Sequence, residues 1–201
     1  EPGRGDDARA IGPVVGDPSA YFMSANRGQA SIALDLKNAE DRDIFERLLA
    51  RADVLVENFR PGAMERVGYG GDELHARFPR LIAAGTSGFG QTGPYAERPA
   101  YDVVAQAMGG IMSITGQPGG VPTRVGTSIG DITAGLFTAI GIQAALVERQ
   151  RSKTGPRVDV SMHDSQVALP ETALARYPVP GQVPGPSGSR PPSHSPAHPR
   201  A

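Results

Sequence analysis

The stretch "TSIGDITAG" places a single carboxylate, Asp131, between a glycine and a run of small residues. The apolar sequence that follows, "LFTAIGIQAALVERQ", predicts a long helix with Asp131 at its start. An acid there could simply cap the helix, because Asp is among the best N-cap residues. It could also be a carboxylate nucleophile, since unpaired N–H groups and the helix dipole favour an anion. Gly130 would then let a substrate approach the backbone closely.

A second group of chemically useful side chains lies in "VENFRPGAMER", directly after a predicted strand. It holds an amide, an aromatic ring and two guanidinium groups: Asn58, Phe59, Arg60 and Arg66. In a parallel sheet, ligands bind at the carboxyl ends of the strands. The ring could stack on a base while the guanidinium groups donate paired hydrogen bonds to phosphates. The alternative is a turn with solvated arginines.

A third group, in "RPAYDVVAQ", consists of Arg98, Tyr101 and Asp102. The residue pattern by itself favours a structural role for Asp102, because an acid in the first turn of a helix interacts well with the helix dipole.

Two other kinds of site are not supported. The loop "GFGQTG" spells G-x-G-x-x-G after a strand, but a dinucleotide site needs a helix to open at the third glycine. Pro94 and Pro99 follow instead, and residues before prolines avoid the helical conformation. The chain has no cysteine, and its four histidines lack zinc-ligand spacing, so no metal site is predicted.

Alternating strands and helices must position these groups. Strands are predicted in "SIALDL", "DVLVENF", "RLIAAGTSGFG" and "RVDVSM". Helices are predicted in "NAEDRDIFERLLARA" with Asn38 as N-cap, in "PGAMERVG", in "GDELHARFP", in "AYDVVAQAMGGIMSIT", and after Asp131. This order predicts an α/β fold, with a Rossmann-like parallel sheet and helices on both faces.

Length and composition divide the chain into three parts. Residues 1–28 are expected to be an irregular N-terminal segment, and residues 29–177 the α/β domain. Residues 178–201 hold eight of the 19 prolines among Gly and Ser, which predicts a linker or a disordered tail. A start at Glu1 in a polar, glycine-rich stretch suggests a fragment or a processed product.

The charge balance argues against several classes of partner. Twenty basic and 21 acidic residues give a net charge of −1, so neither nucleic acid nor a membrane surface is an expected partner. No apolar stretch is expected to reach the roughly 20 residues of a membrane span. With no signal peptide visible, a cytoplasmic location is the default expectation.

The sequence resembles the family III CoA-transferases of the CaiB/BaiF superfamily. Five blocks carry the resemblance, in the order the family has them: "SIALDLK", "ADVLVENFRPGAMERVG", "ERPAYDVVAQAMGG", "TRVGTSIGDITAG" and "SKTGPRVDVSMHDS". It implies that Asp131 is the nucleophile and that no metal is needed. The residues that would contact coenzyme A are Leu34, Lys37, Asn58, Phe59, Arg60 and Arg66, with Arg98 and Tyr101 lining the same pocket.

The resemblance also implies a mechanism and an assembly. Asp131 would form a mixed anhydride with the acyl group and then a thioester with CoA, and the protein would be an interlocked homodimer. Two alternatives stay open: an α-methylacyl-CoA racemase or epimerase of the same superfamily, and a non-catalytic CoA-binding remnant. The racemase branch has a histidine where this chain has Tyr101, and a phenol is a poor base near neutral pH.

Overall fold

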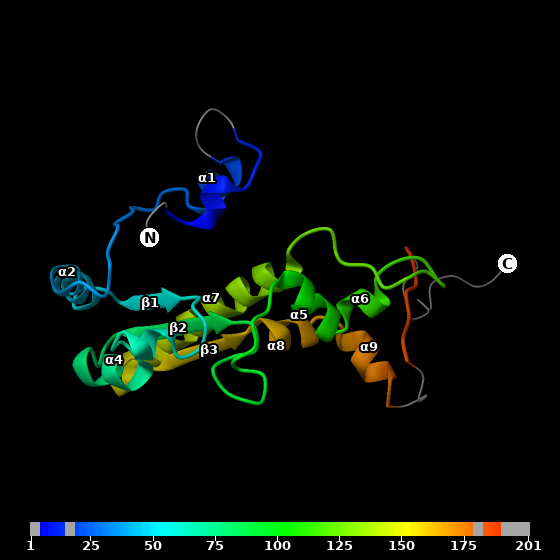
Figure 1. Ribbon diagram of the computed structural model, residues 1–201. Helices are drawn as coiled ribbons and strands as arrows, with labels where there is room; N and C mark the ends of the chain where they lie inside the picture. The colour runs from blue at the N-terminus through cyan, green and yellow to red at the C-terminus, as the bar shows by residue number, and fades with distance from the viewer. Residues whose placement is uncertain (1–4, 15–18, 179–182, 190–201) are drawn as a thin grey trace. The chain divides into compact units, whose positions relative to one another are not determined.

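The computed structural model describes residues 5–14, 19–178 and 183–189. The chain forms two compact units, Glu1–Ala52 and Asp53–Ala201, which are described separately (Figure 1). Most of the predicted linker or tail at 178–201 lies outside the described residues. The sequence-based boundaries after residues 28 and 177 therefore stay predictions.

Within its described residues, 5–14 and 19–52, the first unit contains three short helices, each begun by a polar side chain. They are η1 (Asp7–Ala10), α1 (Ala20–Ala25) and α2 (Ala39–Leu49). Asp6, Ser19 and Asn38 each accept a hydrogen bond from a backbone N–H of the first turn, so the predicted cap at Asn38 is confirmed. The expectation that the start of the chain is wholly irregular was too simple, because η1 and α1 both form there.

The strand predicted in "SIALDL" does not form. In the described structure no other strand pairs with residues 31–36, and a strand without a hydrogen-bonding neighbour is not stable. The backbone instead turns toward α2: the Asp35 N–H donates to a carboxylate oxygen of Asp41 at 2.8 Å. The apolar residues of this segment therefore indicated a strand that has no partner here.

The second unit is built on a parallel sheet. Its strands are β1 (Val54–Glu57), β2 (Ile82–Ser87) and β3 (Arg157–Ser161), in the spatial order β1-β2-β3. Both pairings are parallel, with Val54 opposite Ile82 and Ala83 opposite Arg157. The α/β class and the parallel sheet are thus confirmed, with three described strands rather than four.

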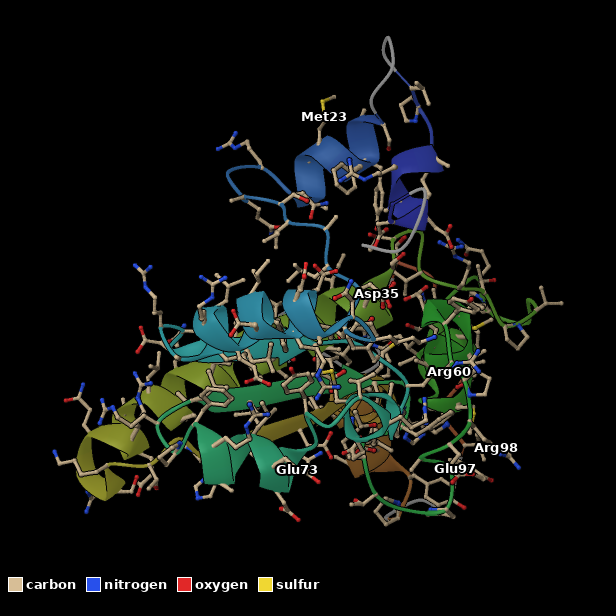
Figure 2. All side chains as sticks on the ribbon, turned by 60° about the vertical axis from the view of Figure 1, so that its left-hand side comes forward. Met23, Asp35, Arg60, Glu73, Glu97 and Arg98 are labelled. Carbon is tan, nitrogen blue, oxygen red and sulfur yellow. The ribbon has the colours of Figure 1, made fainter. Side chains whose placement is uncertain are left out.

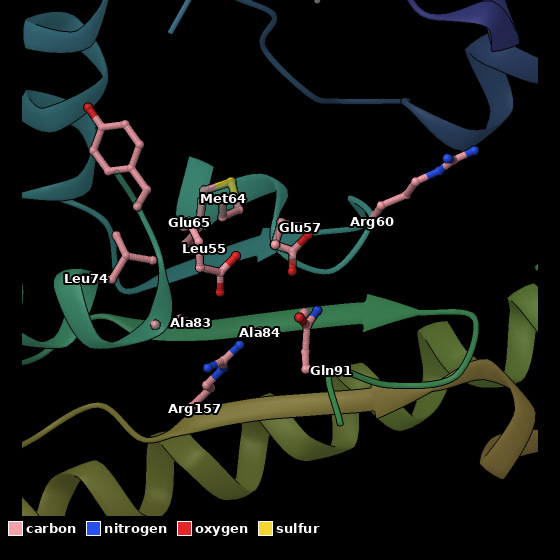
Figure 3. A pocket seen from close by; sticks show the side chains of 14 residues that line it. Leu55, Glu57, Arg60, Met64, Glu65, Leu74, Ala83, Ala84, Gln91 and Arg157 are labelled. Carbon is pink, nitrogen blue, oxygen red and sulfur yellow. The ribbon is translucent and has the colours of Figure 1, made fainter. Parts of the chain in front are cut away.

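Helices cover both faces of this sheet. The long helix α7 (Ile129–Ser152) packs on β2 and β3, where the hydroxyls of Thr86 and Thr138 are hydrogen-bonded at 2.7 Å. On the other face, α3 (Ala63–Arg66) and α4 (Gly71–Arg77) contribute Met64 and Leu74 to a small cavity over β1 and β2 (Figure 3). The prediction of helices on both faces is confirmed.

Further helices follow β2 and β3, and two of them pack against α7. The helix predicted over "AYDVVAQAMGGIMSIT" is two helices, α5 (Asp102–Met108) and α6 (Ile111–Ile114), because Gly110 has a φ of 86° and breaks it. After β3 come α8 (Met162–Val167) and α9 (Glu171–Arg176). Ala105, Ala134, Met162 and Val160 form an apolar cluster that joins α5, α7, α8 and β3.

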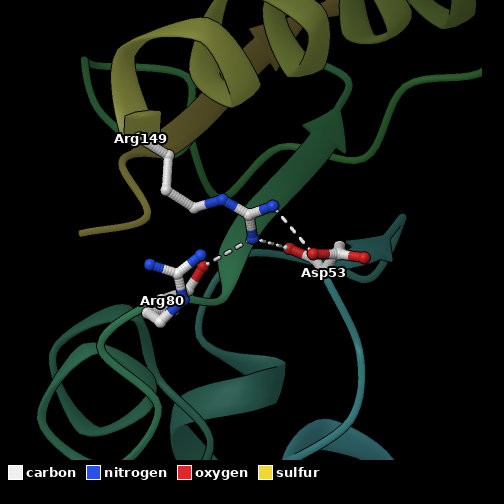
Figure 4. A network of polar contacts seen from close by, with 3 residues as sticks. All are labelled: Asp53, Arg80 and Arg149. Carbon is white, nitrogen blue, oxygen red and sulfur yellow. Dashed lines mark hydrogen bonds and ion pairs between the residues drawn. The ribbon is translucent and has the colours of Figure 1, made fainter. Parts of the chain in front are cut away.

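The far end of α7 is fastened at the amino edge of the sheet (Figure 4). Arg149, in its last turn, donates to the backbone carbonyls of Asp53 and Arg80, just before β1 and β2. It also forms an ion pair with the Asp53 carboxylate at 2.7 Å. Because the C-terminal end of α7 is held at the amino edge, its start is directed to the carboxyl edge, where ligands bind in such sheets.

One expectation from the sequence requires correction here. By length and composition, α7 is apolar enough to cross a membrane, since it carries a single charged residue, Asp131, before Glu148. Within the described residues, 28% of its 18-residue apolar window is buried. One side packs on the sheet, and the apolar side chains on the other side, including Leu136 and Ile140, are exposed.

Candidate active site

A pocket lies at the carboxyl edge of the sheet in the second unit. It encloses about 710 Å³ of space, part of it open to solvent. Residues that end or follow the strands line it: Asn58 after β1, Ser87 at the end of β2 and Met162 after β3. Six of the residues predicted from the sequence to form a site line this single pocket: Asn58, Phe59, Arg60, Arg98, Tyr101 and Asp131.

Asp131 lies in the first turn of α7 but does not cap it. Ser128 holds the N-cap position, and the side chain of Asp131 belongs to the third residue of the helix. The capping interpretation of Asp131 was therefore wrong. Its carboxylate is solvent-accessible, yet partial desolvation, with a contribution from the neighbouring charge of Asp102, raises its pKa above the usual value of 3.8.

Asp102 fixes the start of α7. It is buried in the first turn of α5, and one carboxylate oxygen accepts the backbone N–H of Gly130 at 2.8 Å. A side chain at residue 130 would meet this oxygen at 3.0 Å and the Met162 sulfur at 3.4 Å. Gly130 is thus needed for the close packing of α5, α7 and α8, and the close substrate approach that the sequence suggested stays a prediction.

Gln106, which sequence reasoning did not single out, completes a polar ring. The ring consists of the side chains of Asp102 and Gln106 and the backbone groups that they bond at Val125, Thr127 and Gly130. Its side chain is fully buried and donates to the second carboxylate oxygen of Asp102 at 2.8 Å and to the Thr127 carbonyl at 3.3 Å. Its own oxygen accepts the Val125 N–H at 2.8 Å. The ring therefore joins α5 to the extended segment that leads into α7, and it defines where Asp131 lies.

A second buried glutamine holds the same helical turn from α8. The Gln166 amide donates to the Ile129 carbonyl at 3.3 Å and to the Thr133 hydroxyl at 2.9 Å. In the sequence, Gln106 is an uncharged polar residue among the apolar residues of "DVVAQAM", and that signal could have identified it, because such a side chain needs hydrogen-bond partners when it is buried. Gln166 follows His163, Asp164 and Ser165 in α8, so no comparable signal marks it.

The pocket presents two aromatic rings and two guanidinium groups to a ligand. Phe59 is 57% exposed and Tyr101 is 82% exposed, so both rings are accessible to a ligand. The guanidinium of Arg98 lies over the ring of Tyr95 at 4.2 Å. Figure 2 labels Arg60 and Arg98, which come from the loops that follow β1 and β2.

Side chains at the end of β1 position the rim of the pocket, which is formed there by Asn58, Phe59 and Arg60. The Asn58 amide donates to the Thr86 carbonyl at 2.6 Å, which ties the end of β1 to β2. The Glu57 carboxylate accepts the Phe59 N–H at 2.6 Å, and burial raises the pKa of Glu57 above its usual value. Asn58 therefore has a structural partner, whatever it also contacts in a complex.

Three predicted CoA contacts do not line this pocket. Arg66 closes α3, and its guanidinium lies beside Gly62. Leu34 and Lys37 belong to the first unit. The roles of these three residues stay predictions.

The glycine-rich loop is not directly followed by a helix, as Pro94 and Pro99 predicted. Gly88 lines the pocket, no helix opens at Gly93, and the Gln91 N–H donates to Asp159 at 3.0 Å. In the described part of the chain, no group of three or more His, Asp or Glu side chains is arranged to hold a metal ion.

Known proteins are similar in sequence to this chain along nearly its whole length. The family described as "CoA-transferase family III" matches residues 1–199. The chain is 51% identical, over 97% of its length, to acetyl-CoA:oxalate CoA-transferase from Acetobacter aceti, and 39% identical, over 98%, to succinyl-CoA–D-citramalate CoA-transferase from Chloroflexus aurantiacus. It covers 50% and 49% of these two proteins.

A solved structure gives the same result for the fold. A CaiB/BaiF family protein from Brucella suis superposes with a TM-score of 0.87 and 39% identity, over 92% of this chain and 50% of that one. The chain thus spans about half the length of its relatives. Both the sequence match along nearly the whole chain and the shared fold lead to one conclusion: the chain belongs to CoA-transferase family III.

Proposed function

We propose that this chain supplies the CoA-binding pocket and the nucleophile of a CoA-transferase that moves CoA from an acyl-CoA to a free carboxylic acid. The observation that carries the proposal is the pocket in which Asp131 lies with exposed aromatic rings and guanidinium groups. The rings suit the adenine base and the guanidinium groups suit the phosphates of CoA. The names of the relatives, which are transferases acting on different acids, support the same reaction class.

The proposed chemistry is covalent. The Asp131 carboxylate attacks the thioester carbon of the donor. The C–S bond breaks, the CoA thiolate departs, and a mixed anhydride between Asp131 and the acyl group is formed. The thiolate then attacks the Asp131 carbonyl of the anhydride, which expels the donor acid and leaves a thioester on Asp131. The acceptor carboxylate attacks that thioester, and the released thiolate attacks the new anhydride at the acceptor's carbonyl. Acceptor-CoA is formed and the Asp131 carboxylate is regenerated.

The environment of Asp131 suits a carboxylate nucleophile. A carboxylate is a weak nucleophile, and a higher pKa makes it a stronger one while it stays ionised near neutral pH. Partial desolvation and the charge of Asp102 both act in that direction. Asp102 and Gln106 meanwhile hold the helical turn on which the nucleophile sits.

Chemical trapping tests this proposal. The natural protein that contains this chain is mixed with an acyl-CoA and an acceptor acid, and hydroxylamine is added during turnover. A hydroxamate should appear on Asp131 by peptide mass spectrometry, and both Asp131→Asn and Asp131→Ala should abolish transfer. Transfer by the Asn variant, with deamidation excluded, would refute the aspartyl mechanism. The homodimer that the family resemblance implies is a separate proposal, which sedimentation of the same protein tests.

A further inference from the structure

Ser87 is the last residue of the central strand, and its side chain lines the pocket that contains Asp131. It is 4% exposed, and among the described residues its hydroxyl oxygen has no hydrogen-bond partner. The neighbouring hydroxyl of Thr86 is bonded to Thr138. Leaving a buried hydroxyl unpaired costs stability, so such a group in a ligand pocket is expected to have its partner in the complex.

One other buried side-chain atom in the described structure lacks a hydrogen-bond partner, and its surroundings differ from those of the Ser87 hydroxyl. It is the side-chain oxygen of Gln166, which does not line this pocket and whose amide nitrogen is fully used in holding α7. Ser87 differs because its only polar side-chain atom is unpaired and because the pocket reaches it.

We propose that the Ser87 hydroxyl donates a hydrogen bond to a carbonyl oxygen of the bound acyl-CoA. This inference rests on the proposed function, since it takes acyl-CoA as the ligand of the pocket. An acyl-CoA offers two kinds of carbonyl outside the adenine nucleotide, the thioester and the amides of the pantetheine arm. A donor to the thioester oxygen would also stabilise the negative charge that develops there when a carboxylate attacks.

The experiment compares Ser87→Ala with Ser161→Ala in the natural protein that contains this chain. Ser161 is opposite Ser87 in the β2–β3 register and is also buried, but its hydroxyl accepts the Asp164 N–H at 3.1 Å and caps α8. Ser161→Ala should therefore lower the urea midpoint, whereas Ser87→Ala should leave it unchanged or raise it. In the same Ser87→Ala sample, kcat/KM for the acyl-CoA should fall about 10-fold or more.

Binding of free CoA, measured by calorimetry, separates the two carbonyls. A weaker affinity in Ser87→Ala supports the pantetheine amide, and an unchanged affinity with a lower kcat supports the thioester. Wild-type kcat/KM together with wild-type CoA affinity in Ser87→Ala would refute the inference. So would a drop of the urea midpoint as large as that of Ser161→Ala, because the hydroxyl would then have a partner within the protein.

The same samples distinguish a failure of this inference from a failure of the proposed function. A wild-type protein that transfers no CoA between any acyl-CoA and acid would refute the function. The affinities of wild type and Ser87→Ala for CoA and for acyl-CoA would then still decide the role of Ser87, with equal affinities for both ligands counting against it.

Discussion

Replacing Gln106 by leucine tests whether the buried polar ring holds the start of α7. Leucine has a similar size and suits the helix, so the change removes hydrogen bonds and little packing. The bonds lost are those to the Asp102 carboxylate and the Val125 N–H, both at 2.8 Å, and a longer one of 3.3 Å to the Thr127 carbonyl.

The expected cost follows from these three contacts. The bond to a carboxylate contributes about 1.5–3 kcal/mol and the bond to the Val125 N–H about 1 kcal/mol, while the 3.3 Å contact adds little. Gln106→Leu should therefore lower the free energy of unfolding by about 2.5–4 kcal/mol. That is a large part of the roughly 5–15 kcal/mol of an ordinary domain. With m near 2 kcal/mol/M, the urea midpoint should fall by about 1.3–2 M.

The assay is urea unfolding followed by circular dichroism, with Gln143→Leu as the matched control. Gln143 is exposed on α7, so its replacement should change the stability by no more than about 0.5 kcal/mol. At urea concentrations where Gln106→Leu is still folded, its kcat for CoA transfer should fall more than its affinity for CoA, because Asp131 is displaced and the rim of the pocket is not. A stability within about 0.5 kcal/mol of wild type would refute the reasoning, since the ring would then contribute nothing.

Three further predictions concern the pocket. Because the folded-state pKa of Asp131 is raised, its charge costs stability above that pKa; Asp131→Asn should therefore be more stable than wild type at pH 7, and urea titrations should show the difference shrinking as the pH falls toward 3.8. Arg60→Ala should weaken CoA binding by about 1.5–3 kcal/mol in calorimetry. Arg66 does not line the pocket, so an equal loss of affinity in Arg66→Ala would show that Arg66 also contacts CoA. With Tyr101 in place of a histidine base, a 2-methylacyl-CoA should gain no deuterium in heavy water, and exchange at an enzymatic rate detected by mass spectrometry would favour the racemase.

Local rules predicted the parts of the structure that depend on neighbouring residues. The Asn38 cap and the strands in "DVLVENF" and "RVDVSM" follow from backbone preferences and short-range hydrogen bonds. The pocket could also be anticipated, because residues that follow parallel strands meet at one edge of the sheet. That rule places Asn58, Phe59 and Arg60 near Asp131 without any knowledge of side-chain contacts.

Long-range contacts account for what the sequence did not predict. The segment 31–36 has the composition of a strand, but strand formation depends on a partner edge that composition does not encode. Asp131 looked like a cap because the start of a helix is uncertain by a residue or two, and α7 begins at Ile129. Gln106 is separated by 19 residues from Val125, to which it bonds, so no short motif could reveal the ring.

The polar groups behind Asp131 combine support with electrostatics. A buried carboxylate is costly unless it is hydrogen-bonded, and Asp102 obtains its bonds from Gln106 and from the Gly130 N–H of the helix that carries Asp131. The bonds that satisfy Asp102 are thus the same bonds that position Asp131, the proposed nucleophile. Because this fixed negative charge lies close enough to raise the pKa of Asp131, a well-formed ring also favours a more basic carboxylate. If Asp131 is the proposed nucleophile, fold stability and reactivity in this pocket depend on one set of contacts, made by three buried polar side chains, Asp102, Gln106 and Gln166, around one helical turn.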